Sequence, residues 1–271
     1  MSQTTLVALV TGTSSGFGRA IAAALATAGH QVYGTVRSAG SQTPPGVSPV
    51  TLDITRDDEV AAGVESVMRN SGRIDVLVNN AGIGIGGAIE DFTVEEAKEQ
   101  FDTNFFGTHR MCRAVLPHMR AAGRGHIVNM GSLGGKIAVP FGGFYCASKF
   151  ALEAYSEAMR MEVRPFGISV SVIEPGDFAT SITSNRRMSA ETVVASAYYE
   201  RCTRAEGKMS EDEQKNKDLS PVVNAVLEIV SSRAPALRYP VATATQRFLV
   251  ALRNILPQTV FQKMLADYYG I

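Results

Sequence analysis

The chain has 271 residues, enough for one large domain or two small ones, and 45% of them are hydrophobic, as in an ordinary globular protein. Its 26 Lys and Arg residues balance 26 Asp and Glu residues, so no polyanionic partner is indicated and nucleic-acid binding is disfavoured. The cysteines lack Cys-x-x-Cys spacing and are odd in number, which argues against a zinc site and a disulfide framework; they are Cys112, Cys146 and Cys202. We therefore expect no metal site.

The N-terminus lacks a basic segment, and its apolar run covers only residues 6–10, so we expect no signal peptide. No stretch approaches the roughly 18 consecutive apolar residues of a membrane-spanning helix. These features favour a cytoplasmic protein with reduced thiols.

The chain opens with the pattern of a βαβ unit. Residues 6–10 predict a strand buried on both faces, and after a glycine-rich turn an alanine-rich stretch predicts a helix over residues 19–28. Gly29 is suited to end that helix, and residues 31–36 predict a second strand.

The turn has the spacing Gly-x-x-x-Gly-x-Gly, at Gly12, Gly16 and Gly18, which is neither the Gly-x-Gly-x-x-Gly fingerprint nor a Walker loop. Gly12 permits a tight turn, Gly16 lets the backbone approach a pyrophosphate, and Gly18 lets helix pack on strand. The following helix offers its first amides to the phosphates. A plain turn would also contain glycines, but the strand before and the helix after it favour a nucleotide site.

The end of the second strand bears on the choice of cofactor. In an NAD site a carboxylate about 20 residues past the glycines binds the ribose hydroxyl, whereas here the strand is followed by Arg37 and no acid precedes Asp53. An arginine pairs well with the 2′-phosphate of NADP, with Ser14 or Ser15 assisting. We therefore expect NADP(H) in preference to NAD(H); the alternative is that Arg37 is a solvated surface residue.

A surface loop over residues 38–49 and a strand over residues 50–52 come next. Asp53 is either a turn residue or a contact for the adenine amine. Thr55, with Asp58 three residues on, predicts the start of a helix over residues 56–70.

A fourth strand, residues 74–78, opens into Asn79-Asn-Ala-Gly82, small and amide residues suited to line the ligand cleft of an α/β sheet. Thr93 and Glu96 predict the start of the next helix. In it Asn104 precedes Phe-Phe-Gly, and because glycine costs about 1 kcal/mol inside a helix, we expect a local distortion whose carbonyl binds water.

Tyr145 and Lys149 lie four residues apart in a predicted helix that runs to Val163, so they share one face of it. A nearby ammonium would lower the phenol pKa from ~10 and let Tyr145 protonate a carbonyl oxygen as hydride arrives. Ser132, after the strand 127–130, would hold that oxygen. Taken alone, the pair also fits an amphipathic helix with one extended lysine.

Another strand, residues 168–173, completes six alternations of strand and helix. This predicts an α/β fold with a doubly wound, Rossmann-like parallel sheet of about seven strands and helices on both faces, in a single domain over residues 1–271. We expect a substrate lid over residues 181–219, helical to residue 204 and a solvated charged run over 205–218. Further predicted elements are a helix from Ser220, a strand over 238–241, and C-terminal helices over 246–254 and 258–269 within residues 244–271.

The motifs occur in order over roughly two-thirds of the chain: Thr11-Gly-Thr-Ser-Ser-Gly-Phe-Gly18, Asp53, Asn79-Asn-Ala-Gly82, Asn104, Ser132, Tyr145-x-x-x-Lys149 and Pro175-Gly176. Together they resemble the single-domain short-chain dehydrogenase/reductases. Residues 131–141 and 145–152 are similar to the 17β-hydroxysteroid and retinol dehydrogenase branch.

The resemblance implies catalytic roles for four residues. Tyr145 would be the acid/base, Lys149 would bind the nicotinamide ribose and depress the phenol pKa, Ser132 would bind the substrate oxygen, and Asn104 would anchor a water for proton resupply. With Tyr145 and Lys149, the implied cofactor-binding residues are Gly12, Ser14, Ser15, Gly16, Phe17, Gly18, Arg37, Asp53, Ile54, Asn80, Ala81, Gly82, Pro175, Gly176, Phe178 and Thr180. A homodimer or homotetramer, paired through the helices holding Asn104 and Tyr145, is also implied.

The reaction implied is hydride transfer between nicotinamide and a ketone or secondary alcohol. The candidate pocket residues are almost entirely apolar and favour a lipophilic, steroid- or retinoid-like substrate; they are Ile85, Leu133, Ile137, Val139, Phe141, Phe144 and Met188. The alternatives are reduction of smaller carbonyls, such as keto esters, aromatic ketones or quinones, and a non-catalytic dinucleotide sensor. A sugar-nucleotide epimerase would have a longer C-terminal domain.

Overall fold

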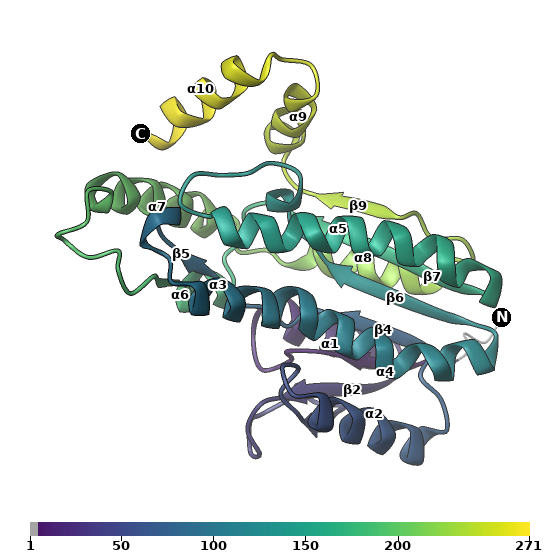
Figure 1. Ribbon diagram of the computed structural model, residues 1–271. Coiled ribbons are helices and arrows are strands. Elements are labelled where there is room, and N and C mark those ends of the chain that lie inside the picture. The colour runs from purple at the N-terminus through teal and green to yellow at the C-terminus, as the bar shows by residue number, and fades with distance from the viewer. Residues whose placement is uncertain (1–4) are drawn as a thin grey trace.

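Seven short strands, most of them buried on both faces, form one parallel sheet in the computed structural model (Figure 1). The structure describes residues 5–271, so the first four residues of the segment in which we expect no signal peptide lie outside it. The strand order is β3-β2-β1-β4-β6-β7-β9. The strands are β1 (Val7–Val10), β2 (Gln31–Val36), β3 (Val47–Thr51), β4 (Val76–Asn79), β6 (Gly125–Met130), β7 (Ile168–Pro175) and β9 (Arg238–Val241).

Helices cover both faces of this sheet (Figure 1). One face packs on α2 (Asp57–Ser71), α4 (Gly107–Ala122) and α5 (Gly143–Val163), and the other on α1 (Gly16–Thr27) and α8 (Ser220–Ser231). Two apolar cores result, one on each side. The predicted doubly wound α/β fold is confirmed.

The strand order reverses between β1 and β4, because the chain first runs outward through β2 and β3 and then returns to β4. The loops after these two strands therefore separate, and ligands of open parallel sheets bind at such a switch point. This positions the glycine turn after β1 opposite the Asn80 segment after β4.

The helix that carries Asn104 is distorted, as predicted. The α3 helix (Val94–Phe101) begins with the predicted capping box between Thr93 and Glu96, and a π-helical turn, Asp102–Phe106, joins it to α4. Gly107 follows because a Cβ there would lie 2.6 Å from Cδ1 of Ile54. Close packing of the first residue of α4 on Ile54 thus offsets the low helix propensity of glycine.

The predicted cap of α2 is wrong. Arg56 precedes α2 without a capping side chain, while the Thr55 amide and hydroxyl donate to Asp53 Oδ1 at 2.9 and 2.8 Å. The nearby carboxylate thus competes successfully for the hydroxyl. The β3 and β4 strands also begin at Val47 and Val76 and not at residues 50 and 74.

The segment after β7 also differs from the prediction. It forms α6 (Ser181–Asn185), β8 (Arg187–Met188), which pairs with β5 (Ile85–Gly86), and α7 (Tyr199–Gln214). A continuous helix to residue 204 is wrong because side chains from this segment bond elsewhere: Thr192 and Ser196 donate to the Asp91 carboxylate. The supposed solvated run instead continues α7, and Ala205 is fully buried.

The C-terminal helices are α9 (Ala244–Arg253) and α10 (Gln258–Tyr269), as predicted. They project from the sheet beyond β9 (Figure 1), and α10 also packs against α7. Phe261 and Leu265 of α10 pack on Ile137. Single 3-10 turns occur at Ile89–Asp91, Leu133–Gly135 and Arg164–Phe166.

None of the helices within residues 5–271 combines the length and apolarity needed to cross a bilayer.

Candidate active site

Two adjoining cavities lie where the predicted site residues converge. A cleft of about 420 Å³ runs past the glycine turn, and a second cavity of about 200 Å³ contains Tyr145. Four residues line both cavities: Phe17, Asn80, Thr180 and Ile182. A molecule in the first could therefore extend into the second.

Most of the predicted cofactor-binding residues line one of these cavities. The cleft is lined by Gly12, Ser14, Ser15, Phe17, Arg37, Asp53, Ile54, Asn80, Ala81, Gly82 and Thr180. The second cavity is lined by Phe17, Asn80, Ser132, Tyr145, Lys149, Pro175, Gly176, Phe178 and Thr180. Gly16 and Gly18 support the turn without lining either cavity.

The glycine turn has the backbone shape that the sequence predicted. Gly12 and Gly16 have φ values of +70° and +55°, which side chains other than glycine rarely adopt. A Cβ on Gly18 would lie 2.3 Å from both Asn80 Nδ2 and the Gly12 carbonyl oxygen. The N-terminus of α1 can therefore approach the cleft, a cradle that fits a dinucleotide phosphate.

Thr11 fastens this turn to the opposite side of the cleft, a role that the sequence analysis missed. Its Oγ1 accepts hydrogen bonds from the backbone amides of Asn80 and Ala81 at 2.9 and 3.0 Å. The Asn80 side chain returns a bond of 2.8 Å to the Thr11 carbonyl. The sequence shows a hydroxyl side chain just before the first glycine, but it does not show the hydrogen-bond partners of that hydroxyl, because they lie far away in the chain.

Arg37 is exposed at the end of β2 and lines the cleft with Asp53. Burial opposes ionisation of Asp53, but hydrogen bonds from Thr55 and the charges of Arg37 and Arg56 hold the pKa of that carboxyl below its ordinary value. Asp53 is thus both a turn residue and part of the cleft wall.

Ser132, Tyr145 and Lys149 meet in the second cavity. Ser132 begins the 3-10 turn after β6, and its oxygen accepts the Gly134 amide at 2.9 Å. Lys149 is buried one turn beyond Tyr145, and its Nζ donates to the Met130 carbonyl at 2.7 Å and lies 5.8 Å from the Tyr145 ring centroid. The predicted sharing of one helix face is confirmed.

The expected lowering of the Tyr145 pKa by Lys149 is wrong for the protein alone. Burial raises the pKa of Tyr145 to about 12, against a hydrogen bond with Ser132 that lowers it. Burial also lowers the pKa of Lys149 to about 8, opposed by the Glu153 carboxylate. Desolvation thus outweighs the hydrogen bond with Ser132 in Tyr145, and the Lys149 ammonium is bonded to the Met130 carbonyl.

Asn104 lies behind the cavities and not in their walls. It is buried, and its side chain closes a pair of hydrogen bonds with Ile83: Oδ1 accepts the amide at 2.8 Å and Nδ2 donates to the carbonyl at 3.0 Å. The backbone carbonyl of Asn104 accepts the Thr108 hydroxyl at 3.4 Å. Water binding at this carbonyl stays a prediction.

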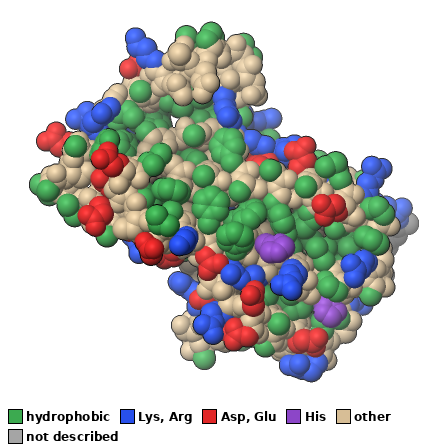
Figure 2. Space-filling view, in the orientation of Figure 1, with side chains coloured by type: hydrophobic (Ala, Val, Ile, Leu, Met, Phe, Trp, Pro, Cys, Tyr) green, Lys and Arg blue, Asp and Glu red, His purple; other side chains and the backbone are tan. Residues whose placement is uncertain are grey.

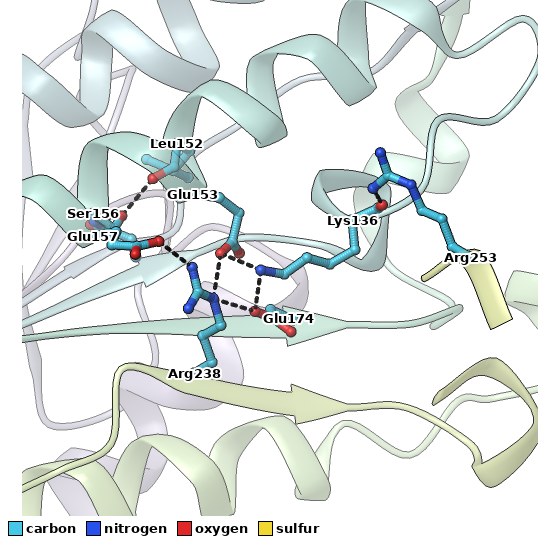
Figure 3. Close-up of polar contacts among 9 residues, drawn as sticks. Lys136, Leu152, Glu153, Ser156, Glu157, Glu174, Arg238 and Arg253 are labelled. Carbon is cyan, nitrogen blue, oxygen red and sulfur yellow. Dashed lines mark hydrogen bonds and ion pairs between the residues drawn. The ribbon is translucent and has the colours of Figure 1, made fainter. Parts of the chain in front are cut away.

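A charged network that the sequence analysis missed joins α5 to β7 and β9 (Figure 3). Glu153 Oε2 accepts Lys136 Nζ at 2.8 Å and Arg238 Nε at 3.1 Å, and Glu174 lies 3.3 Å from the same lysine. Glu153 and Glu174 are both buried. The four residues come from separate parts of the fold, so no local sequence pattern indicates this network.

The apolar part of the predicted pocket is partly right. Ile85, Leu133, Ile137 and Val139 line the second cavity. Phe141, Phe144 and Met188 do not, because Phe144 packs on Phe92, Met188 is exposed on β8, and Phe141 sits in a turn with φ +61°.

The expectation of an almost entirely apolar lining is wrong at one end of this cavity. Four charged side chains also line it, namely Asp177, Arg186, Glu206 and Glu213. Arg186, Glu206 and Glu213 belong to the segment whose structure the sequence analysis predicted wrongly, and Asp177 lies just before it.

Among the described residues, no group of three or more His, Cys, Asp or Glu side chains is placed to hold a metal ion. All three cysteines are buried and unpaired. Burial raises the pKa of the Cys146 thiol beside Tyr145, which disfavours the reactive thiolate.

The sequence of this chain is similar to those of characterised enzymes. Over 98% of both chains it is 42% identical to a 3-ketodihydrosphingosine reductase of Bacteroides thetaiotaomicron. It is 35% identical to human 17-beta-hydroxysteroid dehydrogenase type 1, over 91% of this chain and 80% of that protein. Bovine retinol dehydrogenase 8 is 37% identical over 64% of this chain and 59% of its own length.

Solved structures of short-chain dehydrogenases are also similar to this chain. A short-chain dehydrogenase from Streptomyces avermitilis matches with a TM-score of 0.83 and 34% identity, over 97% of this chain and 98% of its own. A Burkholderia phymatum enzyme in complex with NAD matches with a TM-score of 0.80 and 25% identity over 93% of each chain. A Burkholderia cenocepacia enzyme in complex with NADP matches with a TM-score of 0.74 and 26% identity, over 96% and 97% of the two chains.

The family model for short chain dehydrogenases matches residues 6–191. With relatives above 30% identity along nearly the whole chain, this match shows that the protein belongs to the short-chain dehydrogenase/reductase family and is an oxidoreductase that uses a nicotinamide cofactor.

Proposed function

We propose that this protein is an NADP(H)-dependent oxidoreductase that interconverts a lipophilic ketone and its secondary alcohol. The observation that carries the proposal is the meeting of Ser132, Tyr145 and Lys149 in a cavity with apolar walls that adjoins the dinucleotide cleft. In the reducing direction, a ketone, NADPH and one proton give an alcohol and NADP⁺.

The proposed division of labour follows from the placement of these side chains. The cofactor supplies the hydride. Ser132 orients the carbonyl oxygen, Tyr145 gives it a proton, and Lys149 binds the ribose and stabilises the phenolate left behind. The Asn104 side chain holds the π turn against Ile83. A water bound at the Asn104 backbone carbonyl would pass protons from solvent toward Lys149.

The preference for NADP(H) rests on Arg37. It lines the cleft at the end of β2, and Ser14 and Ser15 of the glycine turn line the same cleft. A guanidinium there suits a phosphate better than a ribose hydroxyl. The other residues that we propose to bind the cofactor line one of the two cavities, except Gly16 and Gly18, which shape the glycine turn.

Among lipophilic ketones, we favour a long-chain keto compound of the 3-ketodihydrosphingosine type. The relative named for that substrate is more similar to this chain, and over more of its length, than those named for steroids and retinol. A steroid or retinoid remains the second candidate because Ile85, Leu133 and Ile137 would suit either.

Three further proposals concern the whole molecule. We propose that residues 181–219 act as a lid, since Ile182, Arg186 and Glu213 line the substrate cavity. Exposed Phe106 and Met161 support pairing of copies through α4 and α5, over which hydrophobic side chains gather (Figure 2). The unpaired buried thiols favour a cytoplasmic location.

The test is a panel of ketones with NADPH consumption followed by its absorbance. It includes 3-ketodihydrosphingosine, a 17-ketosteroid, retinal and a small keto ester, each also run with the Tyr145→Phe variant. We expect the highest kcat/KM for a lipophilic member and loss of that activity in the variant. Preference for the keto ester would refute the lipophilic assignment, and activity that survives in the variant would refute the mechanism.

A further inference from the structure

Four charged side chains from three parts of the chain share one end of the cavity that contains Tyr145. Asp177 follows β7, Arg186 follows α6, and Glu206 and Glu213 project from α7. Glu206 and Glu213 are seven residues apart, so two helical turns place them on one face of α7. Three carboxylates thus accompany one guanidinium.

The guanidinium is already occupied by two of these carboxylates. Arg186 Nη1 donates to Glu206 Oε2 at 3.0 Å, and Arg186 Nη2 donates to Glu213 Oε1. The three side chains keep only 12–16% of their surface exposed. Since the fork of the guanidinium is engaged on both arms, it offers little to an incoming anion.

The carboxylates, in contrast, can accept further hydrogen bonds. Glu213 Oε2 is buried and has no hydrogen-bond partner within the described residues, although a carboxylate oxygen that is buried without a donor is costly. The carboxylate of Asp177 accepts a hydrogen bond from the neutral side-chain amide of Gln246. Burial raises the pKa values of both Glu206 and Asp177, and the negative charge of Glu213 raises them further, although Arg186 opposes the shift.

Among the described residues that line this cavity, no other basic side chain is available to neutralise these carboxylates. The only basic residues that line this cavity are Arg186 and Lys149, and the Lys149 ammonium is bonded to the Met130 carbonyl on the Tyr145 side. The neighbouring side chains from the C-terminal helices, Gln246, Leu249, Leu265 and Tyr269, are uncharged. The shortage of positive charge therefore lies in the wall of the cavity that we propose for the substrate.

Resting on the ketone reduction proposed above, we propose that Glu213, with Glu206 and Asp177, binds an ammonium group of the substrate. The substrate class is a long-chain ketone with a primary amine close to its carbonyl. The amine donates to the unpartnered oxygen of Glu213, while Ile137, Leu249 and Leu265 take part of the alkyl chain. The carbonyl then reaches Tyr145 from the same cavity.

The test compares two ketones of equal chain length that differ in one group next to the carbonyl, a primary amine in one and a hydroxyl in the other. A hydrogen bond to a charged group is worth roughly 1.5–3 kcal/mol, so we expect kcat/KM for the amine to exceed that for the hydroxyl compound by about tenfold or more. In Glu213→Gln the ratio of the two values should fall toward one. The ratio isolates recognition, because both ketones use Tyr145.

The matched control is Glu211→Gln, which removes an exposed carboxylate from the same helix. It should leave the ratio as in the wild type. A wild-type ratio near one would overturn the proposal, as would preference for a third analogue with a carboxylate in place of the amine. Equal loss for both ketones in Glu213→Gln would show a structural residue and also overturn it.

Calorimetric titration with the long-chain amino alcohol and the matching diol separates this proposal from the one on which it rests. Tighter binding of the amine without turnover of either ketone would keep the ammonium site and refute the reductase. Turnover of both ketones with equal binding of the amino alcohol and the diol would keep the reductase and refute the ammonium site. The wild-type comparison requires no variant, so an unstable Glu213→Gln would not obstruct it.

Discussion

Lys149 and Glu153 lie one helical turn apart on α5, and each keeps only 6% of its surface exposed. Burial lowers the pKa of Lys149 to about 8, and the Glu153 carboxylate opposes that decrease. The carboxylate is itself held by Lys136 and Arg238 (Figure 3). A network that lines neither of the two cavities thus helps to keep the proposed ribose-binding lysine charged.

Replacement of Glu153 by Gln should therefore move the alkaline limb of the kcat/KM profile to lower pH. Without the carboxylate the pKa of Lys149 falls further, and since the lysine acts as its protonated form, activity is lost earlier as pH rises. Glu174→Gln is the matched control, because it removes a carboxylate from the same network, with a similar loss of thermal stability. Equal shifts of the limb in both variants, or in neither, would mean that Glu153 has only a structural role.

Tyr145→Phe should lower kcat by ~10²–10⁴-fold, the range that general acid catalysis supplies, and leave NADPH affinity nearly unchanged. The ring still fills its place on α5, and only the proton donor is lost. Steady-state kinetics and fluorescence titration with NADPH measure the two quantities. Parallel loss of both would mark Tyr145 as a structural residue.

Arg37→Asp should lower the ratio of kcat/KM for NADPH to that for NADH by about tenfold or more, because a charge-assisted contact with the phosphate becomes a repulsion. Arg56→Asp supplies the control: it makes the same change of charge near Asp53, at an exposed residue outside the cleft wall. An equal effect of both variants would point to the general field of the surface. An unchanged ratio in Arg37→Asp would refute the phosphate assignment.

Gly18→Ala should destabilise the protein by about 1–3 kcal/mol, the usual range for overpacking. Its Cβ would lie 2.3 Å from Asn80 Nδ2 and the Gly12 carbonyl oxygen, so the cradle would have to open and NADPH would bind more weakly. Gly207→Ala provides the comparison, since a Cβ there meets nothing within 4 Å and should stabilise α7 by roughly 0.5–1 kcal/mol. Urea unfolding measures both, and a neutral Gly18→Ala would contradict the close approach.

The sequence by itself determined those features that depend on residues close together in the chain. Apolar runs such as Leu77 and its neighbours specify buried strands, the glycines at 12, 16 and 18 specify the turn, and a four-residue interval puts Tyr145 and Lys149 on one face. Spacing and backbone sterics suffice for these, because both act over a few residues.

Only the tertiary structure decided the electrostatics. The high pKa of Tyr145, the bond from Lys149 to the Met130 carbonyl and the carboxylates that surround Arg186 depend on segments that are separate in the sequence and meet only in the fold. Desolvation and Coulomb forces act through space, and their size depends on which side chains exclude water from which charges. The order of residues along the chain does not contain that information in any local form.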